Sequence, residues 1–148
     1  MIPSTAERVE RSTGHQINRQ IQAEIRESIR WHAEHPERIG SRLRELDEEW
    51  DIERTLEANA STLAFTGVAL AAAVDRRFLV IPAIVTAFLF QHAVQGWCPP
   101  LPILRRLGFR TAREIATERT ALKAIRGDFA HVHDAGDKAP AALQAARA

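Results

Sequence analysis

Cys98 is the single thiol of the chain and the residue best suited to covalent chemistry. Arg105 and Arg106 follow it closely in the sequence, and cationic groups nearby favour the reactive thiolate form. A disulfide within the chain is excluded, and no base or second cysteine stands close to Cys98 in the sequence. Two interpretations stay open: a reactive or persulfide-carrying thiol, and a small structural residue at a helix end. We favour the structural one.

Three polar residues interrupt the apolar stretch that ends at Trp97: Gln91, His92 and Gln95. In a helix, Gln91 and Gln95 share a face, and His92 lies about 100° around from them. An ionisable residue in a membrane segment is a candidate functional residue, so a buried polar site is one interpretation. The other, which we favour, places these side chains near the membrane interface, bonded to a neighbouring helix or to lipid headgroups.

Other patterns that could support catalysis or ligand binding are weak. His32 with His35 and His131 with His133 form two close pairs, but no cysteine or ordered carboxylate joins either pair. The acidic run over residues 45–53 is typical of a solvated helix face, with a cation site as the weaker alternative. No glycine-rich phosphate loop or nucleophile–base pair is visible, so we expect no catalysis, no metal and no cofactor.

The composition alone describes an ordinary globular protein. The chain has 148 residues, of which 45% are hydrophobic and 26% charged, and its net charge is +1. This balance argues against a nucleic-acid-binding surface, which needs a basic excess. The average hides an uneven distribution, because residues 1–57 are acidic and residues 98–148 are basic.

Two uncharged stretches lie in the middle of the chain, over residues 58–74 and 78–97. As helices they would span about 26 and about 30 Å, close to the roughly 30 Å of a bilayer core. Only Asp75, Arg76 and Arg77 separate them, which predicts an antiparallel transmembrane helical hairpin over residues 57–98. The alternative is a soluble helical bundle with this hairpin as its core.

Arginines flanking the hairpin predict its orientation. Seven lie near its two ends and two lie in the turn, so the positive-inside rule places both termini in the cytoplasm. The flanking arginines are Arg42, Arg44, Arg54, Arg105, Arg106, Arg110 and Arg113. Small residues at helical spacing predict the face on which the two helices pack. They are Ala60, Ala64, Gly67 and Ala71 in the first helix, and Ala83 and Ala87 in the second.

The flanks predict an all-α protein. Residues 1–56 show two apolar stripes, one with Ile17, Ile21, Ile25 and Ile29, the other with Ile39, Leu43, Leu46 and Trp50. We expect two cytoplasmic amphipathic helices that pack against each other, the second running on through Leu56. Helices that lie on the membrane surface are the alternative. Over residues 99–133, we expect prolines to hold an extended interfacial segment before a helix that ends at Gly127. Residues 134–148 are predicted to be a disordered tail.

The run from Trp50 to Phe129 resembles a bacterial family of two-helix inner-membrane hairpins of unknown function. The membrane part of the YgaP rhodanese belongs to this family. The similar residues are 54–59, Arg76-Arg77, Gly96-Trp97-Cys98-Pro99 and Leu107-Gly108. The resemblance implies two transmembrane helices, a bacterial inner-membrane location and a dimer. The resemblance does not imply sulfurtransferase activity, because that activity belongs to a rhodanese domain, which we do not find in this sequence.

The sequence therefore predicts a small, non-enzymatic inner-membrane protein that is anchored by the hairpin. Its cytoplasmic helices would pair with a second copy or with a protein partner whose identity the sequence does not give. The alternative is a thiol- or sulfur-handling membrane accessory that uses Cys98, and a soluble helical bundle is the third possibility.

Overall fold

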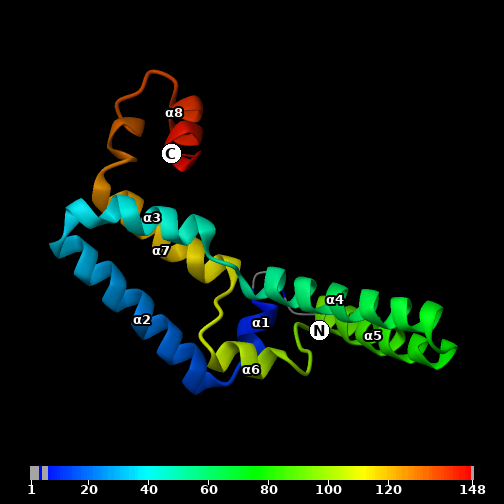
Figure 1. The fold of residues 1–148 in the computed structure, drawn as a ribbon. Coiled ribbons are helices and arrows are strands. Elements are labelled where there is room, and N and C mark those ends of the chain that lie inside the picture. The colour runs from blue at the N-terminus through cyan, green and yellow to red at the C-terminus, as the bar shows by residue number, and fades with distance from the viewer. Residues whose placement is uncertain (1–3, 5–6, 148) are drawn as a thin grey trace. The chain divides into compact units, whose positions relative to one another are not determined.

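The computed structural model describes residue 4 and residues 7–147, and these residues form helices without any β-strand (Figure 1). The all-α prediction is therefore confirmed for this part of the chain. In chain order the helices are α1 (Arg8–Arg11), α2 (His15–Glu34), η1 (Pro36–Arg38), α3 (Ile39–Glu48), α4 (Ile52–Ala73), η2 (Arg76–Leu79), α5 (Val80–Gln95), α6 (Leu101–Arg106), α7 (Ala112–Arg126), η3 (Ala130–Val132) and α8 (Lys138–Arg147).

Two compact units make up the chain, and each combines two separated segments. The first contains Met1–Ile21 and Trp50–Arg113, and the second contains Gln22–Glu49 and Glu114–Ala148. The sequence predicted four consecutive segments instead. The structure differs from that prediction because long-range packing joins residues near the start of the chain to residues beyond position 90.

The core of the first unit lies where α1, α4 and α6 meet. Its buried residues are Val9, Ile52, Leu56, Cys98 and Leu101, with Leu104 and Phe109 packed against them. The Ile52 amide donates a hydrogen bond of 2.9 Å to the Arg110 carbonyl, which joins the start of α4 to the chain after α6. Through Val9, the N-terminal segment is part of the same core as the start of α4 and the chain that follows α5.

Helices α4 and α5 lie side by side and run in opposite directions, with η2 between them (Figure 1). The predicted small-residue face of α4 is turned toward α5. Gly67 is buried, and a Cβ there would lie 2.6 Å from Pro82 Cδ and 2.9 Å from Ile81 Cβ. The other three members of this face, Ala60, Ala64 and Ala71, are half-buried.

The prediction for the facing side of α5 is wrong. Ala83 and Ala87 are exposed, and Ile81 and Pro82 take their place against α4. The small residues of α4 already let the two helices approach closely, so α5 can present larger side chains there.

Among the residues that the structure describes, one helical segment is long and apolar enough to cross a membrane, namely Arg76–Gln95. Helix α4 has the length, at 22 residues, but its first turns are charged and its later ones rich in alanine and hydroxyl side chains.

Two predictions about helix boundaries are wrong for local reasons. A helix starting at Ile39 does not continue through Leu56, because Asp51 starts a new helix by accepting a 2.7 Å hydrogen bond from the Arg54 amide. The prolines after Cys98 do not hold an extended chain. Pro100 precedes α6 and Pro102 lies in its first turn, where a missing N–H group costs little.

The second unit is built around α3 and α7, which bury Ile39, Leu43, Leu46, Ile115 and Leu122 between them. The predicted pairing of α2 with α3 is therefore wrong, since the apolar stripe of α3 is covered by α7. Gly127 ends α7 with a φ of 90°, as the sequence predicted.

A disordered tail was predicted from residue 134, and the structure forms α8 there instead. Ala145 is buried, and Lys123 Nζ donates a 2.9 Å hydrogen bond to the Ala146 carbonyl. Alanine, which favours helices, is the commonest residue of this segment.

Candidate functional site

A left-handed glycine at the end of α5 places Cys98 in the core of the first unit. Gly96 has a φ of 76°, and its amide donates a 2.7 Å hydrogen bond to the His92 carbonyl. A Cβ at this position would also lie 2.5 Å from the backbone carbonyl of Arg8. Both the backbone conformation and the close approach of α1 therefore require glycine here.

His92 lies one turn before Gly96 and is only 3% exposed. Its Nε2 donates a 2.7 Å hydrogen bond to Glu53 Oε2, and Arg8 reaches the other carboxylate oxygen at 3.0 Å. This His92–Glu53–Arg8 network connects α5, α4 and α1. The His92 hydrogen bond, supported by Arg8 and opposed by burial, holds the pKa of the Glu53 carboxyl below its ordinary value of 4.5.

The structure brings Cys98 and His92 together. The imidazole interacts with the Cys98 thiol as well as with Glu53. Its Nδ1 atom is buried without a hydrogen bond of ordinary geometry. The sequence-based argument that no base is near Cys98 is therefore wrong. The three residues are arranged as a thiol, a base and a carboxylate that orients the base.

An apolar cavity of about 420 Å³ opens beside this group. Cys98 and His92 lie in its wall, and most of the remaining wall comes from hydrocarbon side chains of the α4–α5 pair. The lining residues are Leu56, Asn59, Ala60, Leu63, Val85, Phe88, Leu89, His92, Cys98, Pro99, Pro100 and Leu104. The volume lies within the roughly 300–1,000 Å³ of small-molecule pockets.

Other residues that the sequence singled out lie outside this group. Gln91 is half-buried and Gln95 is exposed, and the two share only a weak hydrogen bond of 3.5 Å. Arg105, one of the arginines that flank the predicted hairpin, is only 1% exposed. Its guanidinium donates to the Thr13 hydroxyl, the Asn18 amide oxygen and the Phe109 carbonyl at 3.0–3.2 Å.

The sequence-based reasoning missed Glu53 and Arg8. Glu53 belongs to the acidic run that was interpreted as a solvated face, and Arg8 lies far from α4 in the sequence. One signal was available for Glu53, because it lies one turn before the uncharged stretch that faces α5. In an antiparallel pair, a carboxylate near the start of α4 lies close to polar residues near the end of α5.

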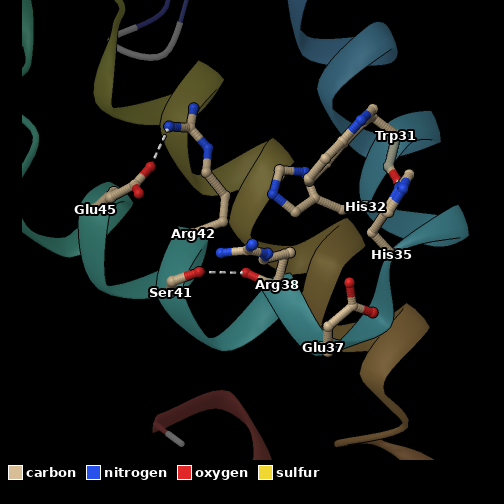
Figure 2. Close-up of a pocket in the computed structure, with 8 residues that line it drawn as sticks. All are labelled: Trp31, His32, His35, Glu37, Arg38, Ser41, Arg42 and Glu45. Atoms are coloured by element: carbon tan, nitrogen blue, oxygen red, sulfur yellow. Dashed lines mark hydrogen bonds and ion pairs between the residues drawn. The ribbon is translucent and has the colours of Figure 1, made fainter.

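A second cavity, of about 330 Å³, lies in the second unit, and Figure 2 shows the eight side chains around it. His35 stacks on Trp31 with a centroid distance of 4.2 Å, and its Nδ1 donates to the Trp31 carbonyl at 2.8 Å. His32 Nδ1 donates to the Ser28 carbonyl at 2.8 Å. Both imidazoles are thus held by backbone carbonyls. The remaining lining residues are Glu37, Arg38, Ser41, Arg42 and Glu45.

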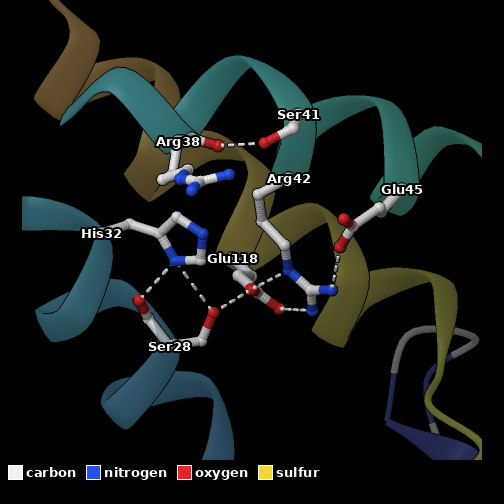
Figure 3. Close-up of polar contacts among 7 residues, drawn as sticks. All are labelled: Ser28, His32, Arg38, Ser41, Arg42, Glu45 and Glu118. Carbon is white, nitrogen blue, oxygen red and sulfur yellow. Dashed lines mark hydrogen bonds and ion pairs between the residues drawn. The ribbon is translucent and has the colours of Figure 1, made fainter. Parts of the chain in front are cut away.

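A buried carboxylate is bound by Arg42, one of the residues that line this second cavity (Figure 3). Glu118 is fully buried. Arg42 donates to its carboxylate through Nε at 2.9 Å and through Nη2 at 3.3 Å. The Ser28 hydroxyl donates to the same carboxylate at 2.6 Å. These contacts join α2, α3 and α7, so the network holds the second unit together.

Within residue 4 and residues 7–147, no group of three or more His, Cys, Asp or Glu side chains could hold a metal ion. No family model, curated protein or solved structure matches the chain.

The Glu53 contacts predict a pH dependence of stability. Because the carboxyl pKa is lowered in the folded state, its stabilising effect is complete above pH 4.5 and is lost as the pH falls below that value. Glu53→Gln should therefore lower the thermal midpoint at neutral pH, and this difference from the wild type should shrink below pH 4.5. Circular dichroism in detergent measures both midpoints. Glu57→Gln, at an exposed position one turn along α4, is the control and should leave the wild-type profile unchanged. A difference that stays constant with pH would contradict the assignment.

Proposed function

We propose that the protein is a small integral membrane protein whose α4–α5 pair lies in a bilayer. The main support is the exposed apolar surface of this pair. In α5 the single buried residue is the polar His92, while Val80, Ile84 and Phe90 are 51–72% exposed. Monomeric proteins in water rarely leave such large continuous apolar surfaces exposed, and a helix that is apolar on all sides requires a nonpolar environment.

Hydroxyl groups on the pair are consistent with the same environment. Ser61, Thr62, Thr66 and Thr86 each donate a hydrogen bond of 2.7–2.8 Å to the carbonyl four residues earlier. Each of these side chains is therefore satisfied within its own helix, as the absence of water in a bilayer core demands. The ionic groups Arg8, Glu53 and His92 gather at the end of the pair that is opposite to η2.

The proposed orientation follows the arginine distribution, with η2 outside and both chain termini in the cytoplasm. The location is a bacterial inner membrane, and this part of the proposal rests on the resemblance alone. The remaining helices would be a non-enzymatic cytoplasmic part that associates with a second copy or with a protein partner. Ala83 and Ala87, which are exposed one turn apart on α5, offer a second copy of the helix a surface for close approach.

A matched pair of substitutions tests the membrane proposal. Ile84 in α5 and Ile103 in α6 are both exposed, at 51% and 61%. Aspartate in the middle of a membrane helix costs about 3 kcal/mol of insertion free energy. Ile84→Asp should therefore move much of the protein into the carbonate-extractable fraction, whereas Ile103→Asp should not.

The alternative of a soluble bundle predicts no difference between the two variants, since aspartate at either exposed position would be tolerated in water. Release of the wild-type protein by carbonate would overturn the proposal, and so would equal behaviour of the two variants. A reporter fused after residue 148 should be active only in the cytoplasm. The size of the solubilised protein in detergent tests association with a second copy, and a monomer would contradict that association.

A further inference from the structure

The cavity beside Cys98 is lined by the thiol, the His92 imidazole and the Asn59 amide, and otherwise by hydrocarbon side chains. We infer that Cys98 is a modification site that accepts a long acyl chain from an acyl thioester. This goes beyond the membrane-anchoring proposal, because it assigns a covalent reaction to the thiol. Cysteines next to membrane segments are common acceptors of such chains.

The first observation is the pairing of the nucleophile with a base. His92 Nε2 is bound to Glu53 at 2.7 Å, and a carboxylate can only accept this bond, so Nε2 carries the hydrogen. The buried Nδ1 has no hydrogen bond of ordinary geometry, and Cys98 lies in the same cavity wall, so His92 is placed to exchange a proton with the thiol during the reaction. Glu53 is thus a positioning residue that fixes which nitrogen acts as the base.

The second observation is the chemistry of the cavity. Its wall includes Leu63, Val85, Phe88 and Leu89, which belong to the exposed surface of the α4–α5 pair. Polar substrates would gain few contacts along this wall, whereas methylene groups would be removed from water. An electrophile with a long hydrocarbon chain is therefore the ligand that the cavity fits.

The reaction is neutral in oxidation state. The Cys98 sulfur attacks the thioester carbonyl carbon after its proton has passed to His92. A new carbon–sulfur bond forms as the bond to the leaving thiolate breaks, and His92 returns the proton to that thiolate. The product is an acyl thioester at Cys98, with the chain lying along the cavity.

The test uses the full-length protein in detergent with two probes, palmitoyl coenzyme A and acetyl coenzyme A. Intact mass spectrometry should show one acyl group, removable by neutral hydroxylamine, and Cys98→Ala should abolish it. The palmitoyl probe should react more than about tenfold faster, the gain expected from burying a few methylene groups. His92→Gln should slow the reaction about 100-fold, as for loss of a general base.

Two tryptophan substitutions distinguish an effect of filling the cavity from a general effect on folding. Leu63→Trp fills the cavity and should remove the preference for the palmitoyl probe, whereas Phe65→Trp, two residues along α4 and outside the cavity, should keep it. The inference would be overturned by equal rates with the two probes, by acylation at other residues only, or by no acylation. These outcomes leave the membrane proposal intact, since that is tested by carbonate extraction.

Discussion

Arg42→Met is expected to lower the free energy of unfolding by about 3–5 kcal/mol, the usual cost of removing one partner of a buried ion pair. The guanidinium lies 2.9 Å from Glu118, and that carboxylate is fully buried between α3 and α7. Without this cation the buried carboxylate of Glu118 loses its ion pair with Arg42. Urea denaturation followed by circular dichroism measures the loss.

Two further variants make this prediction specific. Arg44→Met, at an exposed position on the same helix, should change the free energy by less than about 0.5 kcal/mol. The double variant Arg42→Met with Glu118→Leu should be more stable than Arg42→Met alone, because an apolar pair can replace a buried ion pair. Equal losses for Arg42→Met and Arg44→Met would show that the ion pair does not stabilise the second unit.

Gly96→Ala is expected to have the next largest effect, a loss of about 2–4 kcal/mol. A left-handed backbone at a residue with a side chain costs roughly 1 kcal/mol or more, and overpacking adds about 1–3 kcal/mol. The added methyl would lie 2.5 Å from the Arg8 carbonyl, so α1 has to move away from the end of α5. Faster reaction of Cys98 with a maleimide should accompany the loss of stability.

Gly108 provides the matched control for this substitution. It has a similar left-handed backbone, with a φ of 90°, but open space around its Cα. Gly108→Ala should therefore cost only the conformational part, about 1 kcal/mol, and should leave the reactivity of Cys98 unchanged. Equal losses at the two glycines would mean that the close approach of Arg8 contributes nothing.

Patterns local to one helix were predictable from the sequence. The spacing of small residues identified the face of α4 that includes Gly67, because that spacing repeats with the helix period. The end of α7 at Gly127 followed from the glycine itself. The facing residues of α5 were predicted wrongly, because small residues on one helix leave room for large ones on the other.

Contacts between distant segments were not predictable in the same way. Cys98 and His92 were both identified as candidates, but the sequence does not reveal the turn at Gly96 that brings them together. Glu53 could not be separated from the neighbouring carboxylates by charge, since its role depends on the packing of α4 against α5. The α8 helix depends on a contact between Lys123 and the end of the chain.

The discontinuous make-up of both units has a consequence for synthesis on the ribosome. Residues 8–21 are made early, but the segment with which they share a core extends to Arg113. Residues 22–49 similarly wait for the segment that begins at Glu114. Neither unit can therefore follow the usual order in which N-terminal parts fold first. Both α4 and α5 emerge before either core can close, so the apolar pair can enter a bilayer while the flanking helices are still unassembled.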